Sequence, residues 1–216
     1  MILLTYTGDT TPDTRTLPAL EITKLSVGPM DNNAYLLRCT ATGEQLLIDA
    51  ANDPEKLLAL IGDGGLATVV TTHRHGDHWA ALREIISATR AASIAHPDDA
   101  PQIPVVTSTV ADGGTVRVGE VELDVIHVVG HTPGSICLLY RDPDGHPHLW
   151  TGDSLFPGGV GNTQGDAKRF TSLINDVEHK IFDRLPDDTW FYPGHGKDST
   201  LGRERPSIPE WRERGW

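Results

Sequence analysis

Residues 71–79 read TTHRHGDHW and contain three of the chain's ten histidines together with one aspartate. The apolar run ATVV precedes this stretch, which predicts a strand, and a helical apolar pattern follows it. In a strand alternate side chains point the same way, so His73 and His75 can reach one point in space. Asp77 and His78 follow Gly76, where the chain turns, and therefore project in another direction. One strand-to-helix junction can thus supply two neighbouring metal centres.

A simpler interpretation is that Asp77 only caps the helix and that the histidines are exposed turn residues. The metal interpretation predicts more ligands elsewhere, because three or four ligands per zinc ion cannot all come from one loop. Three candidates stand at the ends of predicted strands: His131 in VVGHTPGS, Asp153 in LWTGDSLF and His195 in FYPGHGKD. Each follows a glycine, which lets the backbone turn tightly and approach a crowded site. Five histidines and two aspartates suffice for two metals if one carboxylate bridges them.

The apolar patterns predict two similar halves, each with strands followed by a helix and a further strand. The expected strands are 20–27, 33–39, 44–50 and 67–73, then 115–129, 135–141, 148–156 and 189–196. The expected helices are 54–61, with Asp53 as its cap, a helix after the histidine cluster, and 166–185. We expect two sheets sandwiched between helices.

Composition narrows the function classes. The formal charge of −12 argues against general nucleic-acid binding, which would need a basic surface. Cys39 and Cys137 form neither a CxxC pair nor a disulfide framework, so we expect free, buried thiols. The chain start lacks the basic segment of a signal peptide and the length of a membrane span, so we expect a soluble, cytoplasmic protein without a membrane partner.

The segments THRHGDH, GHTPGS, GDSLF and PGHG, in this order and spacing, resemble the metallo-β-lactamase superfamily and specifically its glyoxalase II-like (hydroxyacylglutathione hydrolase-like) branch. The resemblance covers nearly the whole chain. It implies an α+β fold with two mixed sheets in a four-layer αββα sandwich, here expected as a single domain over residues 1–216. The ending PGHGKDSTLGRER is similar to small bacterial members without the extra C-terminal helical domain, which we therefore do not expect.

The resemblance also implies a role for each candidate ligand. His73, His75 and His131 would hold one divalent ion, Asp77, His78 and His195 would hold the other, and Asp153 would bridge them. Asp49, at the end of the strand 44–50, would support the metal loop by hydrogen bonding. Among the other histidines, we expect His127 to be packed within its strand and the following four to be solvated: His96, His146, His148 and His179.

The implied activity is metal-dependent hydrolysis. Two ions about 3.5–4 Å apart would lower the pKa of a shared water and create a bridging hydroxide. A small-molecule thioester suits such a site, since a thiolate, with a thiol pKa near 8.5, leaves without obligatory protonation. We expect a glyoxalase II-like thioesterase that depends on Asp77 and Asp153 and uses two zinc ions, although iron and manganese also suit these ligands.

Several alternatives stay open. The glyoxalase II branch often has a lysine and an aromatic residue after GDxLF, where they meet the glutathione carboxylate, but this chain has Asn162 and Gln164 there. Another thiol carrier is therefore open, as are lactone and phosphodiester substrates. A persulfide dioxygenase-like enzyme with one iron shares the THxHxDH pattern, but the chain lacks a GCGRTDFQ-like segment. A purely structural metal site is disfavoured because such sites are usually rich in thiolates. The sequence predicts no oligomeric state and no role for Arg203 and Arg205.

Overall fold

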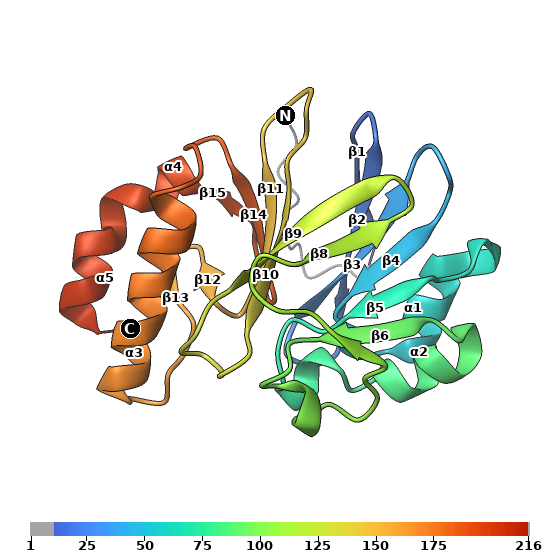
Figure 1. Cartoon of the computed structure of the whole chain (residues 1–216), viewed down its shortest axis with the longest axis horizontal. Helices are drawn as coiled ribbons and strands as arrows, with labels where there is room; N and C mark the ends of the chain where they lie inside the picture. The colour runs from blue at the N-terminus through green and yellow to red at the C-terminus, as the bar shows by residue number, and fades with distance from the viewer. Residues whose placement is uncertain (1–10, 216) are drawn as a thin grey trace.

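The computed structural model describes residues 11–215, which form two mixed β-sheets with helices on both outer faces (Figure 1). The first sheet has the order β1-β2-β3-β4-β5-β6-β7, and the second has the order β15-β14-β11-β10-β9-β8. A small hairpin, β12-β13, lies beside the second sheet. The prediction of an α+β, four-layer αββα sandwich is confirmed.

The elements have the following bounds. The first sheet comprises β1 (Asp13–Thr16), β2 (Leu20–Val27), β3 (Asn32–Cys39), β4 (Gln45–Ile48), β5 (Thr68–Val70), β6 (Ala92–Ala95) and β7 (Ser108–Thr109). The second comprises β8 (Thr115–Val118), β9 (Val121–His127), β10 (Ile136–Tyr140), β11 (His148–Gly152), β14 (Trp190–Pro193) and β15 (Ser199–Thr200), with the hairpin β12 (Leu155–Phe156) and β13 (Gly159–Val160). The helices are α1 (Pro54–Ile61), α2 (Leu82–Thr89), α3 (Ala167–Asp176), α4 (Leu201–Glu204) and α5 (Ile208–Arg214).

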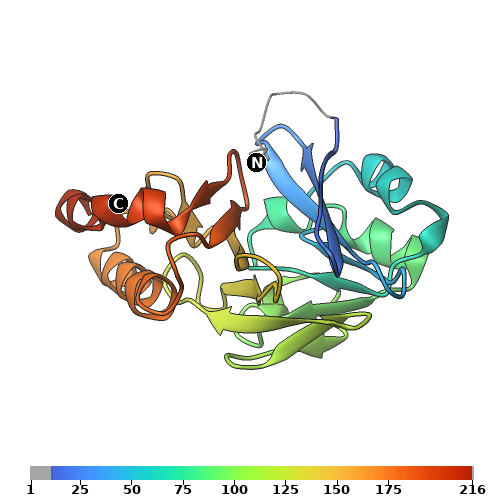
Figure 2. The ribbon, with the colours of Figure 1, turned by 90° about the horizontal axis from the view of Figure 1, so that it is seen from above.

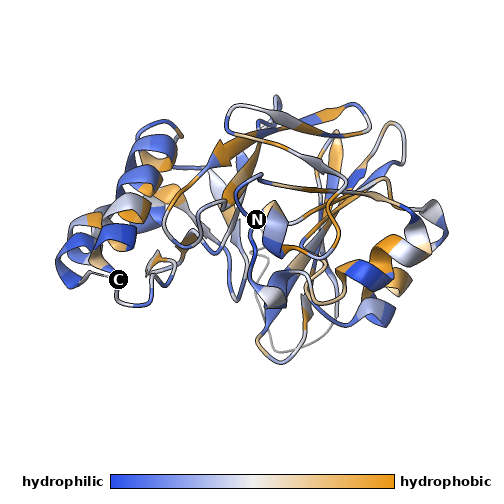
Figure 3. Ribbon diagram, turned by 60° about the horizontal axis from the view of Figure 1, so that its bottom comes forward, coloured by the Kyte–Doolittle hydropathy of each residue, from blue (hydrophilic) through white to orange (hydrophobic). Residues whose placement is uncertain are grey.

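Three apolar clusters join the four layers. The cluster between the sheets includes Ile22, Leu37 and Trp150, all fully buried. A second cluster joins the first sheet to α1 and α2, and a third joins the second sheet to α3 and α5. Figure 2 shows the helical layers on opposite sides of the paired sheets, and Figure 3 shows apolar residues concentrated on the strands and on the inner helix faces. This burial follows from the strand and helix periodicities of the sequence.

Two parallel strand pairs bring distant parts of the chain to one edge. β4 pairs with β5 so that Ile48 lies beside Val70, and β11 pairs with β14 so that Gly152 lies beside Pro193. The carboxyl ends of parallel strands meet at the same edge of a sheet, where open α/β sheets commonly bind ligands. The segments leaving these four strands carry Asp49, the histidine cluster, Asp153 and His195.

Some element predictions were wrong in detail. The expected strand 115–129 is the hairpin β8-β9, because its two apolar runs pair antiparallel. The expected helix 166–185 is α3 followed by a π-helical segment, Val177–Phe182. Arg205 donates to the carbonyl of Phe182 at its end and to the carbonyl of Leu185 just beyond it. β1, β6 and β7 were not predicted. Asp53 precedes α1 but makes no capping bond, since its carboxylate accepts from the backbone of Gly28 and from Lys56 instead.

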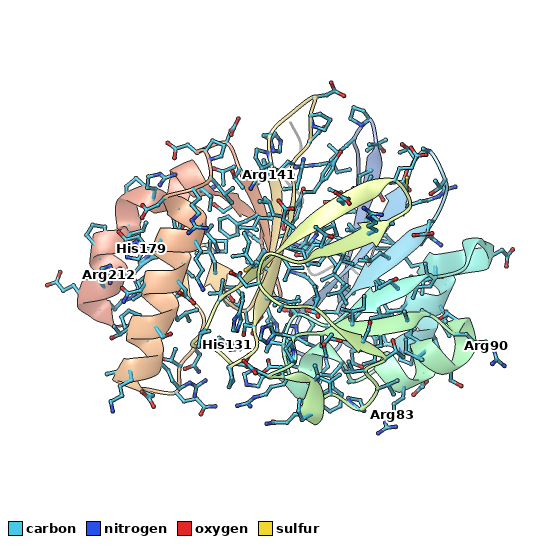
Figure 4. All side chains as sticks on the ribbon, viewed as in Figure 1. Arg83, Arg90, His131, Arg141, His179 and Arg212 are labelled. Carbon is cyan, nitrogen blue, oxygen red and sulfur yellow. The ribbon has the colours of Figure 1, made fainter. Side chains whose placement is uncertain are left out.

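The four histidines expected to be solvated divide into two classes. His179 is exposed on the outer helical layer (Figure 4), as predicted, and His146 is half-buried. His96 and His148 are buried, so that expectation was wrong for both. His96 directly follows β6 and stacks on the ring of His127, which is half-buried and packed against it. His148 begins β11, where cross-strand pairing turns it toward the intersheet core.

The buried His148 belongs to a polar network inside that core. Arg15 donates to the Tyr192 hydroxyl at 3.0 Å, so the hydroxyl proton is available to Nδ1 of His148 at 2.8 Å. Burial, assisted by His146 and Arg15, lowers the pKa of His148 to about 3. Both cysteines are free and buried as expected, and no helix among residues 11–215 is long and apolar enough to cross a membrane.

We predict that His148 makes folding sensitive to mild acid. Because its folded pKa lies below the usual 6.5, the unfolded chain binds more protons below that pH. The contribution of neutral His148 to the free energy of unfolding is therefore complete above about pH 6.5. It is lost progressively as the pH falls toward 3, by up to about 1.4 kcal/mol per pH unit. Urea unfolding of metal-free protein between pH 7 and 4 should show a shallower decline for His148→Gln than for the parent. The exposed His179→Gln serves as control, and parallel curves for His148→Gln and the parent would contradict the prediction.

Candidate metal centre

Three imidazoles converge at the edge where the strands end; we call His73, His75 and His131 the first ligand group. Nδ1 of His75 lies 3.1 Å from Nε2 of His73 and 2.9 Å from Nε2 of His131. Two ligands of a tetrahedral zinc ion, each at about 2.0–2.1 Å, lie about 3.3 Å apart. Figure 4 shows His131 at the lower edge, between the two helical layers. The first group therefore has the spacing of three ligands around one ion.

Asp77, His78 and His195 form the second ligand group. Oδ2 of Asp77 lies 3.6 Å from Nε2 of His78 and 3.3 Å from Nε2 of His195. The turn predicted past Gly76 is a short 3₁₀-helix, Gly76–His78, which carries Asp77 and His78 into the second group. The structure thus brings the six residues together in two neighbouring groups.

Asp153 lies between the two groups. Its Oδ2 is 3.6 Å from Nε2 of His131 in the first group and 3.5 Å from Nε2 of His195 in the second, while its Oδ1 is 3.4 Å from Nε2 of His78. Within residues 11–215, Nε2 of His78 and Oδ1 of Asp153 are buried without a hydrogen-bond partner. Such orphaned polar atoms are costly in a native structure unless another group satisfies them.

Four of the five histidines donate their outer ring nitrogen to an oxygen. Nδ1 of His131 bonds the carbonyl of Asn162, and Nδ1 of His195 bonds the carbonyl of Met30. Nδ1 of His78 bonds Asp49 at 2.8 Å, and Nδ1 of His73 lies 3.1 Å from the Thr72 hydroxyl, which itself donates to Asp49. These bonds hold a ring proton on the outer nitrogen, so the inner nitrogen is the one that can bind a metal once any proton on it is displaced, the usual arrangement around a bound metal.

The electrostatics of the two groups differ. Burial lowers the pKa of His73 well below its usual value, that of His131 to about 4 and that of His75 as well, so the first group favours neutral imidazoles. In the second group burial alone would lower the histidine pKa values. At His78 the negative charges of Asp153 and Asp49 outweigh burial and raise the pKa well above its usual value. At His195 the bonds to Asp153 and Asp77 outweigh burial and raise the pKa to about 10. The pKa of Asp77 is lowered, chiefly by its bond from His195. The site favours positive charge between its carboxylates.

The donor set fits divalent metal ions of zinc, iron or manganese type. Imidazole nitrogen and carboxylate oxygen are suitable ligands for all three. The orphaned atoms of His78 and Asp153 point between the ligand groups, and the lone pairs of the first group face one another at distances that only a shared cation or proton makes favourable. Gly194 adapts the backbone to this crowding, since a Cβ there would lie 2.3 Å from Oδ1 of Asp153.

The loop that carries His195 depends on residues that sequence reasoning missed. Lys24 on β2 donates to the carbonyl of Gly196 and pairs with Asp198, both at 2.7 Å, and is almost completely buried. Asn33 donates to the carbonyls of Pro193 and Gly196. Asn32 donates to Asp77 at 2.9 Å. The only sequence signal for these roles is the presence of polar residues inside otherwise apolar strands.

A further cluster, His96, Asp98 and His127, also brings ligand atoms within 4.8 Å of one another. Its two rings stack at 3.9 Å between centroids with 22° between planes, so their in-plane lone pairs run nearly parallel and do not converge. Nε2 of His127 also lies 2.7 Å from the carbonyl of Pro133. The cluster therefore lacks the geometry of the two ligand groups.

The metallo-beta-lactamase superfamily model matches residues 27–195, which include all seven candidate ligands. The chain belongs to this superfamily. A hydroxyacylglutathione hydrolase from Polaromonas sp. is 39% identical over 169 residues, which make up 76% of this chain and 62% of that relative. This similarity agrees with the glyoxalase II-like branch. The chain spans less than two thirds of that relative's length.

Two solved structures extend the superfamily comparison. ETHE1 from Myxococcus xanthus has a TM-score of 0.77 at 27% identity, with 89% of this chain and 84% of that chain covered. TTHA1623, solved in a di-iron-bound form, has a TM-score of 0.71 at 30% identity, with 87% of this chain and 98% of that chain covered. A protein with this fold and of similar length therefore holds two iron ions.

We predict that Lys24→Met destabilises the protein by about 3–5 kcal/mol, because it leaves a buried carboxylate without its partner. Burial already raises the pKa of Asp198 to about 6 despite the Lys24 ion pair. The control is Lys56→Met, which removes an exposed partner of Asp53 and should cost less than about 1 kcal/mol. Urea unfolding at pH 7 measures both, and an equally small effect of the two changes would rule out a supporting role for Lys24.

Proposed function

We propose that the chain is a hydrolase with two divalent metal ions and that it cleaves small-molecule thioesters in the manner of glyoxalase II. The observation that carries the proposal is the pair of ligand groups joined by Asp153 at one sheet edge. His73, His75 and His131 would hold one ion, Asp77, His78 and His195 the other, and Asp153 both. The hydroxyacylglutathione hydrolase relatives and the di-iron form of TTHA1623 support this assignment.

The protein's own residues prepare the site for this chemistry. Divalent ions held there would supply a water of lowered pKa and positive charge where an oxyanion develops. The outward hydrogen bonds of His78, His131 and His195 keep their inner nitrogens unprotonated once an ion replaces the proton. His73 and His78 are buried, whereas His75 and His195 are partly exposed, so a substrate can approach from one side only.

A thioester substrate requires little else from the protein. The thiolate product is a good leaving group with a thiol pKa near 8.5, so no general acid is needed for its departure. The segment 159–165 borders the first ligand group through the bond between the Asn162 carbonyl and His131. It presents the exposed Asn162 and Gln164, which are neutral amides, toward solvent. We propose that the thiol part of the substrate contacts this segment.

The main alternative is an oxidoreductase with one iron. The second ligand group argues against it, because Asp77 lies within 3.6 Å of His78 and 3.3 Å of His195, which is close enough for the three to share a second ion. Lactones and phosphodiesters would use the same metal ligands, so a substrate panel must include them.

We predict that the metal-loaded chain hydrolyses at least one S-lactoyl or other S-acyl thioester of a small thiol and that EDTA abolishes this activity. Separate Asp77→Asn and Asp153→Asn changes should each lower kcat/KM by more than about 100-fold, since losing even an outer partner of a ligand costs about 10- to 100-fold. His179→Gln, on the exposed helical face, should retain full activity.

The outcomes separate the candidates. No turnover on any thioester would exclude the thioesterase proposal, and hydrolysis of a lactone or phosphodiester alone would reassign the substrate class. One iron per chain with oxygen consumption on a persulfide would establish the oxidoreductase alternative. Full activity of both aspartate variants would contradict the assigned metal sites.

A further inference from the structure

Asp99 is a buried carboxylate outside the seven candidate ligands. It lies in the loop after β6, and its side chain is completely inaccessible to solvent. Its Oδ2 accepts from the backbone N–H of Arg74 at 3.0 Å and from the Thr132 hydroxyl at 2.5 Å, while its Oδ1 accepts from the backbone N–H of Gly134 at 3.0 Å. A buried charge is retained only where hydrogen bonds or ion partners compensate its desolvation.

These three donors come from the two segments that carry the first ligand group. Arg74 lies between His73 and His75, and Thr132 directly follows His131. We propose that Asp99 is a positioning residue that fixes the first ligand group by tying these two segments together. Fixing both segments reduces the freedom of three imidazoles whose nitrogens must lie about 3 Å apart.

A carboxylate is specifically suited to this position. It has two acceptor oxygens for three donors, whereas an asparagine amide would place an NH₂ group against at least one N–H or O–H donor. The Arg74 guanidinium, 3.9 Å from Oδ1, further offsets the negative charge. The fit is tight, because a Cβ on Gly134 would lie 2.7 Å from the backbone nitrogen of Asp99.

Asp99 and Asp49 differ in which ligand groups their hydrogen bonds support. Asp49 bonds Thr72 beside the first group and His78 in the second, so it supports both. Among residues 11–215, the side-chain hydrogen bonds of Asp99 join it to Arg74, Thr132 and Gly134, which flank the first group. Loss of the Asp99 carboxylate should therefore weaken one metal position and spare the other.

The experiment compares zinc binding, by chelator competition and elemental analysis, in the full chain and in Asp99→Asn. It rests on the proposed two-metal centre, which the parent tests separately by binding about two ions. Asp99→Asn should bind one ion about 10- to 100-fold more weakly and the other unchanged. The matched control is Asp98→Asn, since the neighbouring carboxylate is 58% exposed and should leave both affinities unchanged.

A second background assigns the weakened position. Asp77→Asn should leave one ion, held by the first group, and adding Asp99→Asn should loosen that remaining ion while adding Asp98→Asn should not. Thr132→Val, which removes one bond to Asp99, provides a milder test if Asp99→Asn fails to fold, and it should weaken the same ion several-fold.

Three results would overturn the role of Asp99. The first is zinc binding like the parent's in both Asp99→Asn and Thr132→Val. The second is that Asp99→Asn weakens the binding of both ions equally. The third is that Asp99→Asn weakens only the ion of the second group, which is the ion that remains in His75→Ala. A parent that binds no zinc would overturn the metal centre itself, whereas zinc binding with normal Asp99 effects but no thioester turnover would contradict only the proposed activity.

Discussion

The mutual crowding of imidazole nitrogens at the sheet edge is the constraint on which the rest of the structure depends. Nε2 of His73 and Nε2 of His131 both lie within 3.1 Å of Nδ1 of His75, and the outer nitrogens of His73 and His131 carry the ring protons. Facing lone pairs repel unless a cation or a proton lies between them. The fold must therefore hold these side chains in an arrangement that they would not adopt by themselves. A bound cation would replace the repulsion between their lone pairs by attraction and so stabilise the folded chain.

Strand pairing, apolar packing and buried charged residues together hold the candidate ligands in place. Parallel pairing of β4 with β5 and of β11 with β14 fixes the strand ends, and apolar clusters on both faces of each sheet hold the strands. Buried charges then fix the loops: Asp49 holds the start of the histidine cluster, and Lys24 with Asp198 holds the loop of His195. All three are buried. Asp49 accepts from the backbone N–H of Thr72, next to His73, and Lys24 donates to the backbone carbonyl of Gly196, next to His195, while Asp198 neutralises the buried Lys24.

The candidate ligands were easier to find in the sequence than the residues that support them. The candidates lie at chain turns after strands, where residue type and spacing carry a direct signal, so the set of seven could be proposed and the sandwich fold inferred. Asn32, Lys24 and Asp99 act through contacts between segments distant in the chain, which periodicity does not report. The same limitation explains the errors at His148 and His96: neither has a local signal of burial, and only sheet pairing and ring stacking place them inside.

The most direct test of this account is the anomalous X-ray scattering of crystals of the zinc-loaded protein. We expect two peaks per chain, one among His73, His75 and His131 and one among Asp77, His78 and His195, with Asp153 in contact with both. A single peak in only one group, or peaks confined to the cluster of His96, Asp98 and His127, would contradict it.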